Sequence, residues 1–170
     1  MQSYYIYMDQ GIAANLRDAN LCSGQFGSCA PIVMYNANDH DCALYHLAGC
    51  NSLDKLKMKD LHLLASCVGP TIAYVLTGAA DTYSNTGPFS GHVGPVTAFF
   101  RSRRIPVTYD FNGRSDFSSV FVSLVAGKLD ISPSMPADRI ELKTKSVIKE
   151  LPDIVGFVGE DRDEKLKKWR

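Results

Sequence analysis

Short apolar runs separated by polar clusters mark the first part of the chain. Residues 4–8 alternate weakly between apolar and polar side chains, which is typical of a β-strand. Residues 30–35 form a compact apolar run with β-branched members, and residues 42–48 form another. The linking residues 36–41 are rich in Asn and Asp, whose side chains favour turns. We therefore predict that residues 30–35 and 42–48 pair as a β-hairpin. We interpret the mixed, polar residues 9–19 as an excursion, that is, a connecting segment outside the sheet.

A helical pattern follows the hairpin. Ser52 can cap a helix, and the leucines after it recur near one face, as in an amphipathic helix of about three to four turns. Gly69 and Pro70 end this helix, because neither residue favours helical geometry. The leucines expected to share the inner face are Leu53, Leu56, Leu61 and Leu64, and the charged residues expected largely elsewhere are Lys55, Lys57, Lys59 and Asp60.

The next segments repeat this order of strand and helix. Residues 71–76 give a third strong strand signal, and the glycine-rich residues 77–93 are interpreted as a loop. Residues 94–104 predict a second helix, whose basic end suits the helix dipole. Its inward-facing residues are Val96, Phe99 and Phe100, and the cations near its end are Arg101, Arg103 and Arg104.

The remaining residues complete the predicted fold class. Residues 105–111 and 119–126 predict strands on either side of a tight turn at Asn112-Gly113. Together the signals predict an α+β protein in which two helices pack on antiparallel-rich sheets. We expect one domain over residues 1–150, followed by a C-terminal extension at 151–170 whose charged end is frayed.

The length and the net charge of the chain limit the classes of function that the protein can have. The 170 residues suffice for one domain with a substantial core. The 18 basic residues balance 18 acidic ones, so the net charge gives no basis for binding nucleic acid or an anionic membrane. No apolar run approaches the ~20 residues of a membrane helix, and the N-terminus lacks a signal-peptide pattern. We expect a cytoplasmic protein, with signal-independent secretion as an effector as the alternative.

The cysteines and histidines show no metal or disulfide pattern. The five cysteines are irregularly spaced and include no C-x-x-C pair, and the four histidines include no H-x-x-x-H pair. We therefore expect no metal and no cofactor. Four cysteines are interpreted as buried small hydrophobic residues, namely Cys22, Cys42, Cys50 and Cys67.

Cys29 differs, because its neighbours suit a nucleophile. Gly27 permits a sharp turn, and main-chain amides around Gly27 and Ser28 can stabilise an oxyanion. His46 stands 17 residues after Cys29, and the predicted hairpin returns it beside the thiol, whose proton an imidazole can take. These residues also fit a packed cysteine and a half-buried strand histidine, so both alternatives stay open.

The segment around Cys29 resembles the signature of the chemoreceptor glutamine deamidases (the CheD family). That signature has a Thr, then Leu-Gly-Ser-Cys, then an apolar strand ending near Tyr-Asp-Pro, then a strand that carries a His. Here Phe26-Gly27-Ser28-Cys29 matches the tetrapeptide, and residues 33–36 match the strand end. His46 keeps the family's interval, and Ser23 occupies the Thr position, six residues before the cysteine. Weaker matches continue in order to about residue 130.

The resemblance implies a protein-glutamine deamidase with Cys29 as nucleophile, His46 as base and Ser23 orienting the imidazole. It implies a mixed, largely antiparallel β-sandwich flanked by helices, a glutamine-bearing protein substrate and a regulatory protein partner. The cytotoxic necrotizing factors and related bacterial lethal factors share the three-residue arrangement, so the substrate is a chemoreceptor or a host protein. Gln25 and His92 are further candidates for lining the substrate cleft.

The chain also departs from the family pattern. Ser23 replaces the family's Thr, and Pro31 stands where an aliphatic residue is usual. Because proline lacks an N–H, we expect Pro31 at a sheet edge or at an unpaired position. The alternatives left open are a non-catalytic binding module with this fold and another thiol hydrolase, such as a transglutaminase or a peptidase.

Overall fold

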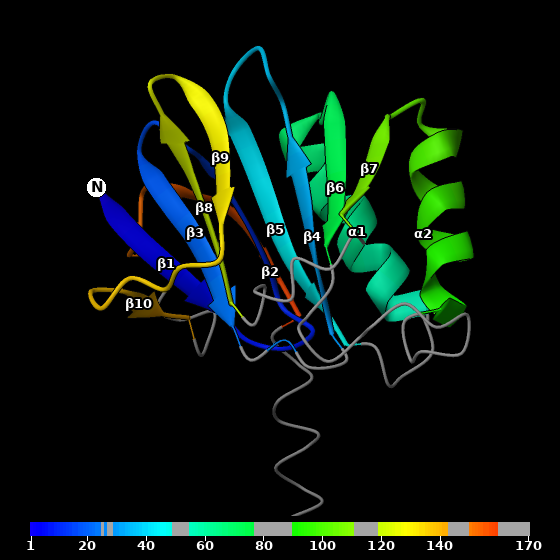
Figure 1. Ribbon diagram of the computed structural model, residues 1–170, viewed down its shortest axis with the longest axis horizontal. Helices are drawn as coiled ribbons and strands as arrows, with labels where there is room; N and C mark the ends of the chain where they lie inside the picture. The colour runs from blue at the N-terminus through cyan, green and yellow to red at the C-terminus, as the bar shows by residue number, and fades with distance from the viewer. Residues whose placement is uncertain are drawn as a thin grey trace, which may run out of the picture.

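Two β-sheets and two helices make up the described part of the protein (Figure 1). The computed structural model describes residues 1–24, 26, 29–48, 55–76, 90–110, 119–142 and 150–159, apart from the side chains of residues 90–93 and 110. Over these ranges the protein is a mixed α+β structure, which confirms the predicted class.

The first sheet, sheet A, has the strand order β10-β1-β3-β8-β9. Strand β1 pairs in parallel with β3 and β10, whereas β8 pairs antiparallel with β3 and β9. The bounds are β1 Gln2–Ile6, β3 Ala19–Gly24, β8 Ser119–Val125, β9 Lys128–Ser132 and β10 Ile140–Glu141. The parallel β1–β3 pairing sets Ile6 beside Ser23.

The second sheet, sheet B, has the strand order β11-β2-β5-β4-β6-β7. Its described pairings are antiparallel except for β6 with β7. The bounds are β2 Gly11–Asn15, β4 Ala30–Tyr35, β5 Asp41–Leu47, β6 Ile72–Leu76, β7 Val107–Asp110 and β11 Ile154–Val158. Strands β4 and β5 form the predicted hairpin, with Pro31 opposite His46.

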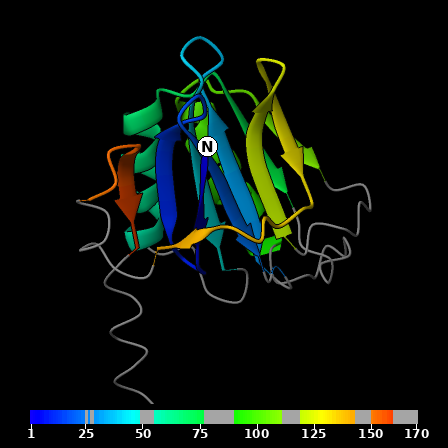
Figure 2. The ribbon, with the colours of Figure 1, turned by 90° about the vertical axis from the view of Figure 1, so that its left-hand side faces the viewer.

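The sheets pack face to face, and both helices cover the other face of sheet B (Figures 1 and 2). The core between the sheets includes Tyr4, Ile6, Leu21 and Val122 from sheet A and Ile12, Val33 and Leu44 from sheet B. The core under the helices includes Ile32, Tyr45, Val75, Leu61, Leu64 and Phe100. Sheet B is thus buried on both faces, which explains why β4 and β5 are nearly continuous apolar runs.

Helix α1 spans Lys55–Val68, and its buried face only partly matches the predicted one. Leu61 and Leu64 are fully buried, but Leu56 is 52% exposed. Lys57 is buried instead, since it forms an ion pair with Asp9 in which Nζ and Oδ1 are 3.5 Å apart. The helix ends at Gly69 as predicted, with the glycine in the left-handed region. Asp60 is also buried, and Ser52 and Leu53 lie outside the described residues.

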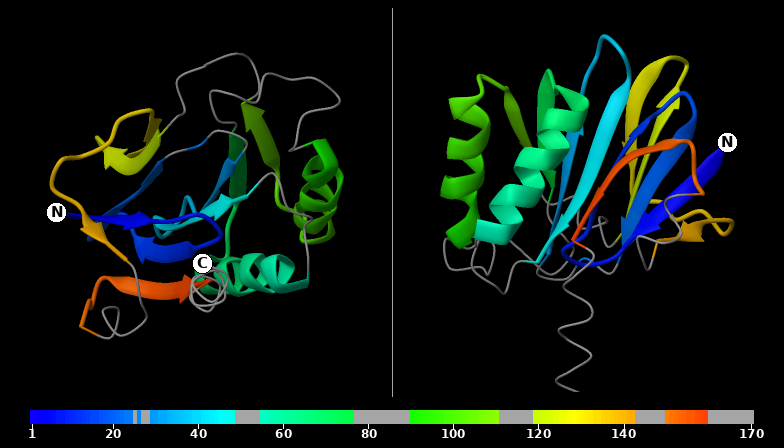
Figure 3. Two further views of the ribbon diagram at one scale, coloured as in Figure 1. Left: turned by 90° about the horizontal axis from the view of Figure 1, so that it is seen from below. Right: turned by 180° about the vertical axis from the view of Figure 1, so that it is seen from behind.

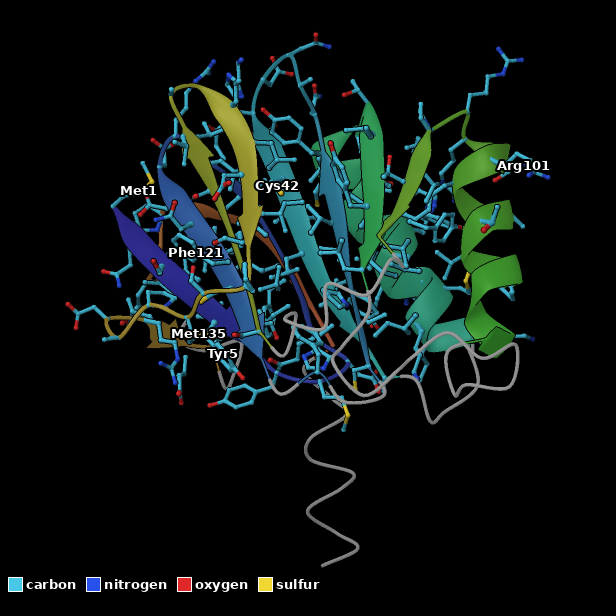
Figure 4. The ribbon with its side chains drawn as sticks, in the orientation of Figure 1. Met1, Tyr5, Cys42, Arg101, Phe121 and Met135 are labelled. Carbon is cyan, nitrogen blue, oxygen red and sulfur yellow. The ribbon has the colours of Figure 1, made fainter. Side chains whose placement is uncertain are left out.

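Helix α2 spans Ser90–Ser102, so it begins four residues before the predicted start. His92 therefore lies in the first turn of the helix and not in a loop. Gly91 and Gly94 have low helix propensity, which hides this turn in the sequence pattern. The inward and outward residues are as predicted: Val96, Phe99 and Phe100 are buried, and Arg101, Arg103 and Arg104 are exposed. Figure 4 shows Arg101 on the side of α2 away from the sheets.

The sequence pattern did not predict strands β2, β3, β9, β10 or β11. Strand β2 lies within residues 9–19, which we interpret from the sequence as an excursion. It was missed because Ile12, Ala13 and Ala14 are all buried, so apolar and polar side chains do not alternate along it. Strand β9 follows β8 directly through a turn at Ala126 and Gly127. Strand β11, from the end of the chain, pairs antiparallel with β2 and lies near α1 (Figure 3). The charged tail from residue 160 lies outside the described residues.

Candidate functional site

The predicted site residues come from three strands that meet at one end of the sandwich, the lower end in Figure 1. Ser23 lies at the end of β3, His46 near the end of β5, and Cys29 directly before β4. Sheet A supplies Ser23, whereas sheet B supplies the other two. The site is therefore built across the interface between the two sheets.

Ser23 and His46 form a hydrogen bond in this interface. Both side chains are buried, and Ser23 Oγ lies 2.9 Å from His46 Nδ1. The Ser23 hydroxyl donates its proton to the main-chain oxygen of Ile6, over 2.7 Å. Its oxygen must then accept from Nδ1–H of the imidazole. This chain of bonds fixes the tautomer and leaves a lone pair on Nε2.

The environment of His46 keeps the imidazole neutral. The residue is 2% exposed, and the Phe26 ring packs against it with 4.2 Å between ring centroids. Burial lowers the pKa of His46 to about 3. Nε2 is buried and has no hydrogen-bond partner within the described part of the chain. His46 thus presents an unprotonated Nε2 that can accept a proton, although its pKa lies well below the neutral range in which a general base is most effective.

Cys29 lies on the same face of sheet B as His46. Its side chain is 7% exposed and belongs to the core between the sheets, together with Phe26 and Ala48. In the hairpin, Ala30 is opposite Leu47 and Pro31 is opposite His46. Continued by one residue, this register sets Cys29 opposite Ala48 and diagonal to His46, a separation that long side chains bridge. The thiol and the imidazole therefore point into one interface.

Pro31 lies in a central strand, with β5 on one side of β4 and β6 on the other, so of the two expected positions it does not take the sheet edge. The described register of β4 with β6 begins only at Ile32. The main-chain groups of His46 bond to Asp9 and Gln10 on β2's side. The Pro31–His46 pair is therefore a non-hydrogen-bonded pair, in which opposite side chains approach most closely. Proline's missing N–H removes no bond to β5.

A β-bulge at the start of β2 holds the main chain of His46. Asp9 has a φ of 58°, and its N–H donates to the His46 oxygen over 2.7 Å. The His46 N–H donates to the Gln10 oxygen over 2.9 Å, so two residues of one strand oppose one residue of the other. Gln10 N–H donates to Tyr7 and closes the turn. Sequence reasoning missed this bulge, although Asp tolerates the left-handed region better than most residues.

The remaining candidate residues lie apart from this cluster or outside the described residues. Gln25, Gly27, Ser28 and Cys50 are among the latter, as is the side chain of His92. Cys22 and Cys42 are buried as expected, and burial raises the pKa of Cys22 to about 12 and the pKa of Cys42 further. Cys42 lies higher on β5, away from the site (Figure 4). Cys67 is exposed on α1, so its predicted burial is wrong.

The described part of the chain contains neither a metal-binding cluster nor a membrane-spanning helix. No cluster of three or more His, Cys, Asp or Glu side chains is arranged to hold a metal ion in that part of the chain. No helix there combines the length and the apolar character needed to cross a bilayer.

Comparisons with known proteins do not assign this chain to a family. No protein-family model matches the sequence. A search of curated proteins gives no significant match. A functional proposal therefore rests on the geometry of Ser23, Cys29 and His46.

Proposed function

We propose that this protein is a cysteine-dependent protein-glutamine deamidase, with Cys29 as nucleophile, His46 as general base and Ser23 as the residue that positions the imidazole. One observation carries the proposal. Ser23 binds Ile6 and His46 Nδ1 at once, which leaves the Nε2 lone pair in the interface that the Cys29 thiol shares. A buried serine, histidine and cysteine arranged in this way match the needs of thiol catalysis.

The reaction proceeds through a thioester. The Cys29 sulfur attacks the side-chain carboxamide carbon of a glutamine while its proton passes to His46 Nε2. The tetrahedral intermediate collapses as Nε2–H donates its proton to the leaving nitrogen, and ammonia departs. Water then gives a proton to Nε2 as its oxygen attacks the thioester carbon, and the sulfur recovers the proton as glutamate is released. The net change is glutamine plus water to glutamate plus ammonia.

The neutral imidazole fits this sequence of proton transfers. Burial disfavours imidazolium at His46, so the resting site holds a thiol and an imidazole rather than a separated ion pair. Proton transfer then accompanies attack, and the protonated state exists only beside the developing negative charge. Ser23 assists, because its oxygen accepts from Nδ1–H in both states of the ring.

The glutamine specificity rests on the sequence resemblance of residues 23–46 to the CheD family. A chemoreceptor is the first substrate class, and a host protein attacked by a toxin-type enzyme is the second. Oxyanion donors at the main chain of Gly27 and Ser28, and a cleft lined by Gln25 and His92, stay predictions of the sequence.

The test is deamidation of a chemoreceptor cytoplasmic domain and of β-casein, an unfolded glutamine-rich protein. We expect ammonia release and a gain of about one dalton at the modified glutamine, through hydrolysis of a Cys29 thioester. Cys29→Ser and His46→Ala should keep the circular dichroism spectrum of the wild type and lose this activity. Full activity in either variant would contradict the assignment.

A non-catalytic binding module is the second candidate, favoured by the burial of the site. Cys29 is only 7% exposed, and the low pKa of His46 makes it a weak base in the resting protein. Alkylation by iodoacetamide near neutral pH separates the two candidates, since a base that takes the Cys29 proton during attack should make the wild type react faster than His46→Ala. Because Cys67 is the exposed cysteine among those that the structure describes, the rate should be measured in a Cys67→Ser background, with Cys29 followed by peptide mass spectrometry.

A further inference from the structure

Asp9 contacts the end of β5 at two points. Its N–H donates to the His46 oxygen, and its Oδ1 accepts from Ala48 N–H over 3.1 Å. In a regular antiparallel ladder, main-chain groups of the neighbouring strand would make both bonds. Here the left-handed conformation of Asp9 interrupts the ladder, and the Asp9 carboxylate accepts from Ala48 N–H in place of a main-chain oxygen.

The segment held by Asp9 carries His46 and faces Cys29, so it links the two reacting residues of the proposed site. His46 begins it, and Ala48 ends it opposite Cys29 when the hairpin register is continued. The Ala48 bond is buried, so loss of the acceptor would leave a main-chain N–H without a partner in the core. The end of β5 would then be free to move relative to both Ser23 and Cys29.

Two further contacts hold Asp9 in place. Lys57 of α1, 2% exposed, forms its ion pair with the same Oδ1 atom that accepts from Ala48. On the other side, Gly159 at the end of β11 packs against the main chain of the bulge. A Cβ at Gly159 would overlap the Asp9 carbonyl and would lie 2.9 Å from Gln10 Cα. The bulge is thus enclosed between a helix and the last described strand.

We infer that Asp9 is a positioning residue for the Cys29–His46 pair, and that it acts through its hydrogen bond to Ala48 rather than through its charge. The activity readout of this inference rests on the proposed function. The structural readout does not, because the tautomer of His46 can be measured without a substrate.

The test compares two double variants that both lack the ion pair. Asp9→Asn/Lys57→Met keeps an acceptor for Ala48 N–H, whereas Asp9→Gly/Lys57→Met keeps only the left-handed conformation, which Asn and Gly both tolerate. Histidine ring nitrogen–proton NMR spectra, assigned with His46→Asn, report the tautomer. We expect a single Nδ1–H tautomer in the wild type and in the Asn variant, and a mixture in the Gly variant.

The deamidase activities of the two double variants should differ in the same way as their tautomers. With β-casein as the probe, the Asn variant should restore kcat to within a few-fold of the wild type. The Gly variant should lose kcat by at least about tenfold with little change in KM, since a misplacement of ~1 Å can reduce rates by about 100-fold. A merely stabilising residue would lower the denaturation midpoint of the Gly variant and leave the tautomer and the ratio of kcat to KM unchanged.

Gly159→Ala provides an independent route if the Gly double variant does not fold. It displaces the bulge from the other side while both charges remain, and the same mixture of tautomers is expected. Equal tautomer populations in all folded variants would overturn the inference. Equal kcat values in an active protein would overturn it too. If the tautomers differ but the wild type releases no ammonia, the positioning role stands and the proposed function fails.

Discussion

At the scale of residues, Ser23 decides which nitrogen of His46 carries the proton. Its hydroxyl is committed to the Ile6 carbonyl, so only its oxygen remains for the imidazole. A threonine would offer the same atoms with a stiffer side chain, because its β-branch restricts rotation. The role of this residue is therefore open to a test that separates the hydroxyl from the volume of the side chain.

Ser23→Ala should lower kcat by about 10- to 100-fold, because His46 loses the acceptor that sets its tautomer. This loss is smaller than the full ~10²–10⁴-fold that general-base catalysis contributes, since the imidazole itself remains. Ser23→Thr keeps the hydroxyl and should retain kcat to within a few-fold, even if the added methyl group lowers stability. Steady-state ammonia release measures both. Equal loss in the two variants would indicate that packing, and not the hydroxyl, matters.

The burial of His46 also makes stability depend on pH. The pKa of His46 is about 3 in the folded protein and near 6.5 in the unfolded chain, so the unfolded state binds the proton first as the pH falls. This stability is fully present above about pH 6.5, and it is lost toward pH 3 at up to ~1.4 kcal/mol per pH unit. Urea unfolding at several pH values should show a smaller acid loss in His46→Asn. Parallel curves for the two proteins would refute the buried, neutral state.

At the scale of elements, helix α1 shows how an ion pair changes the face that a helix buries. Lys57 and Leu64 are seven residues apart and lie on the same side, directed at sheet B. Leu56 precedes Lys57 and is turned to solvent. Counting leucines alone therefore selects a face that is rotated from the buried one.

Leu64→Ala should lower the free energy of unfolding by about 2–5 kcal/mol, because it removes a fully buried side chain and leaves a cavity. Leu56→Ala is the matched control in the same helix, and it should change stability by no more than about 0.5 kcal/mol. Urea denaturation followed by circular dichroism measures both values. A larger effect at Leu56 would support the face that the sequence pattern predicted.

At the scale of the whole molecule, strand β11 joins the end of the chain to the beginning. It pairs with β2, and Phe157, opposite Ile12, packs against the core between the sheets. Gly159 then closes over the bulge at Asp9. Gly159 and Asp9 thus support the same site, although they lie near opposite ends of the described chain.

Phe157→Ala should cost about 1–3 kcal/mol, less than the ~3–5 kcal/mol of a fully buried phenylalanine, because its ring is only partly buried. Val155, 61% exposed on the same strand, provides the control. Val155→Ala should stay within about 0.5 kcal/mol. If the two substitutions had equal effects on the urea midpoint, β11 would not contribute to the core in the way described.

The sequence by itself determined the parts that depend on local pattern. Residues 30–35 and 42–48 are apolar runs joined by an Asn- and Asp-rich turn, and this pattern suffices for the hairpin that brings His46 back toward Cys29. The core face of α2 also follows from its spacing of Val96, Phe99 and Phe100.

Only the tertiary structure decided the parts that depend on contacts between distant segments. Strand β2 has no alternating pattern because both of its faces are buried, and the burial of Lys57 requires Asp9 on another element. The left-handed Asp9 is stable only where His46, Ala48 and Lys57 converge on it. The contacts of Asp9 join residues 37 or more positions apart, and no local periodicity records them.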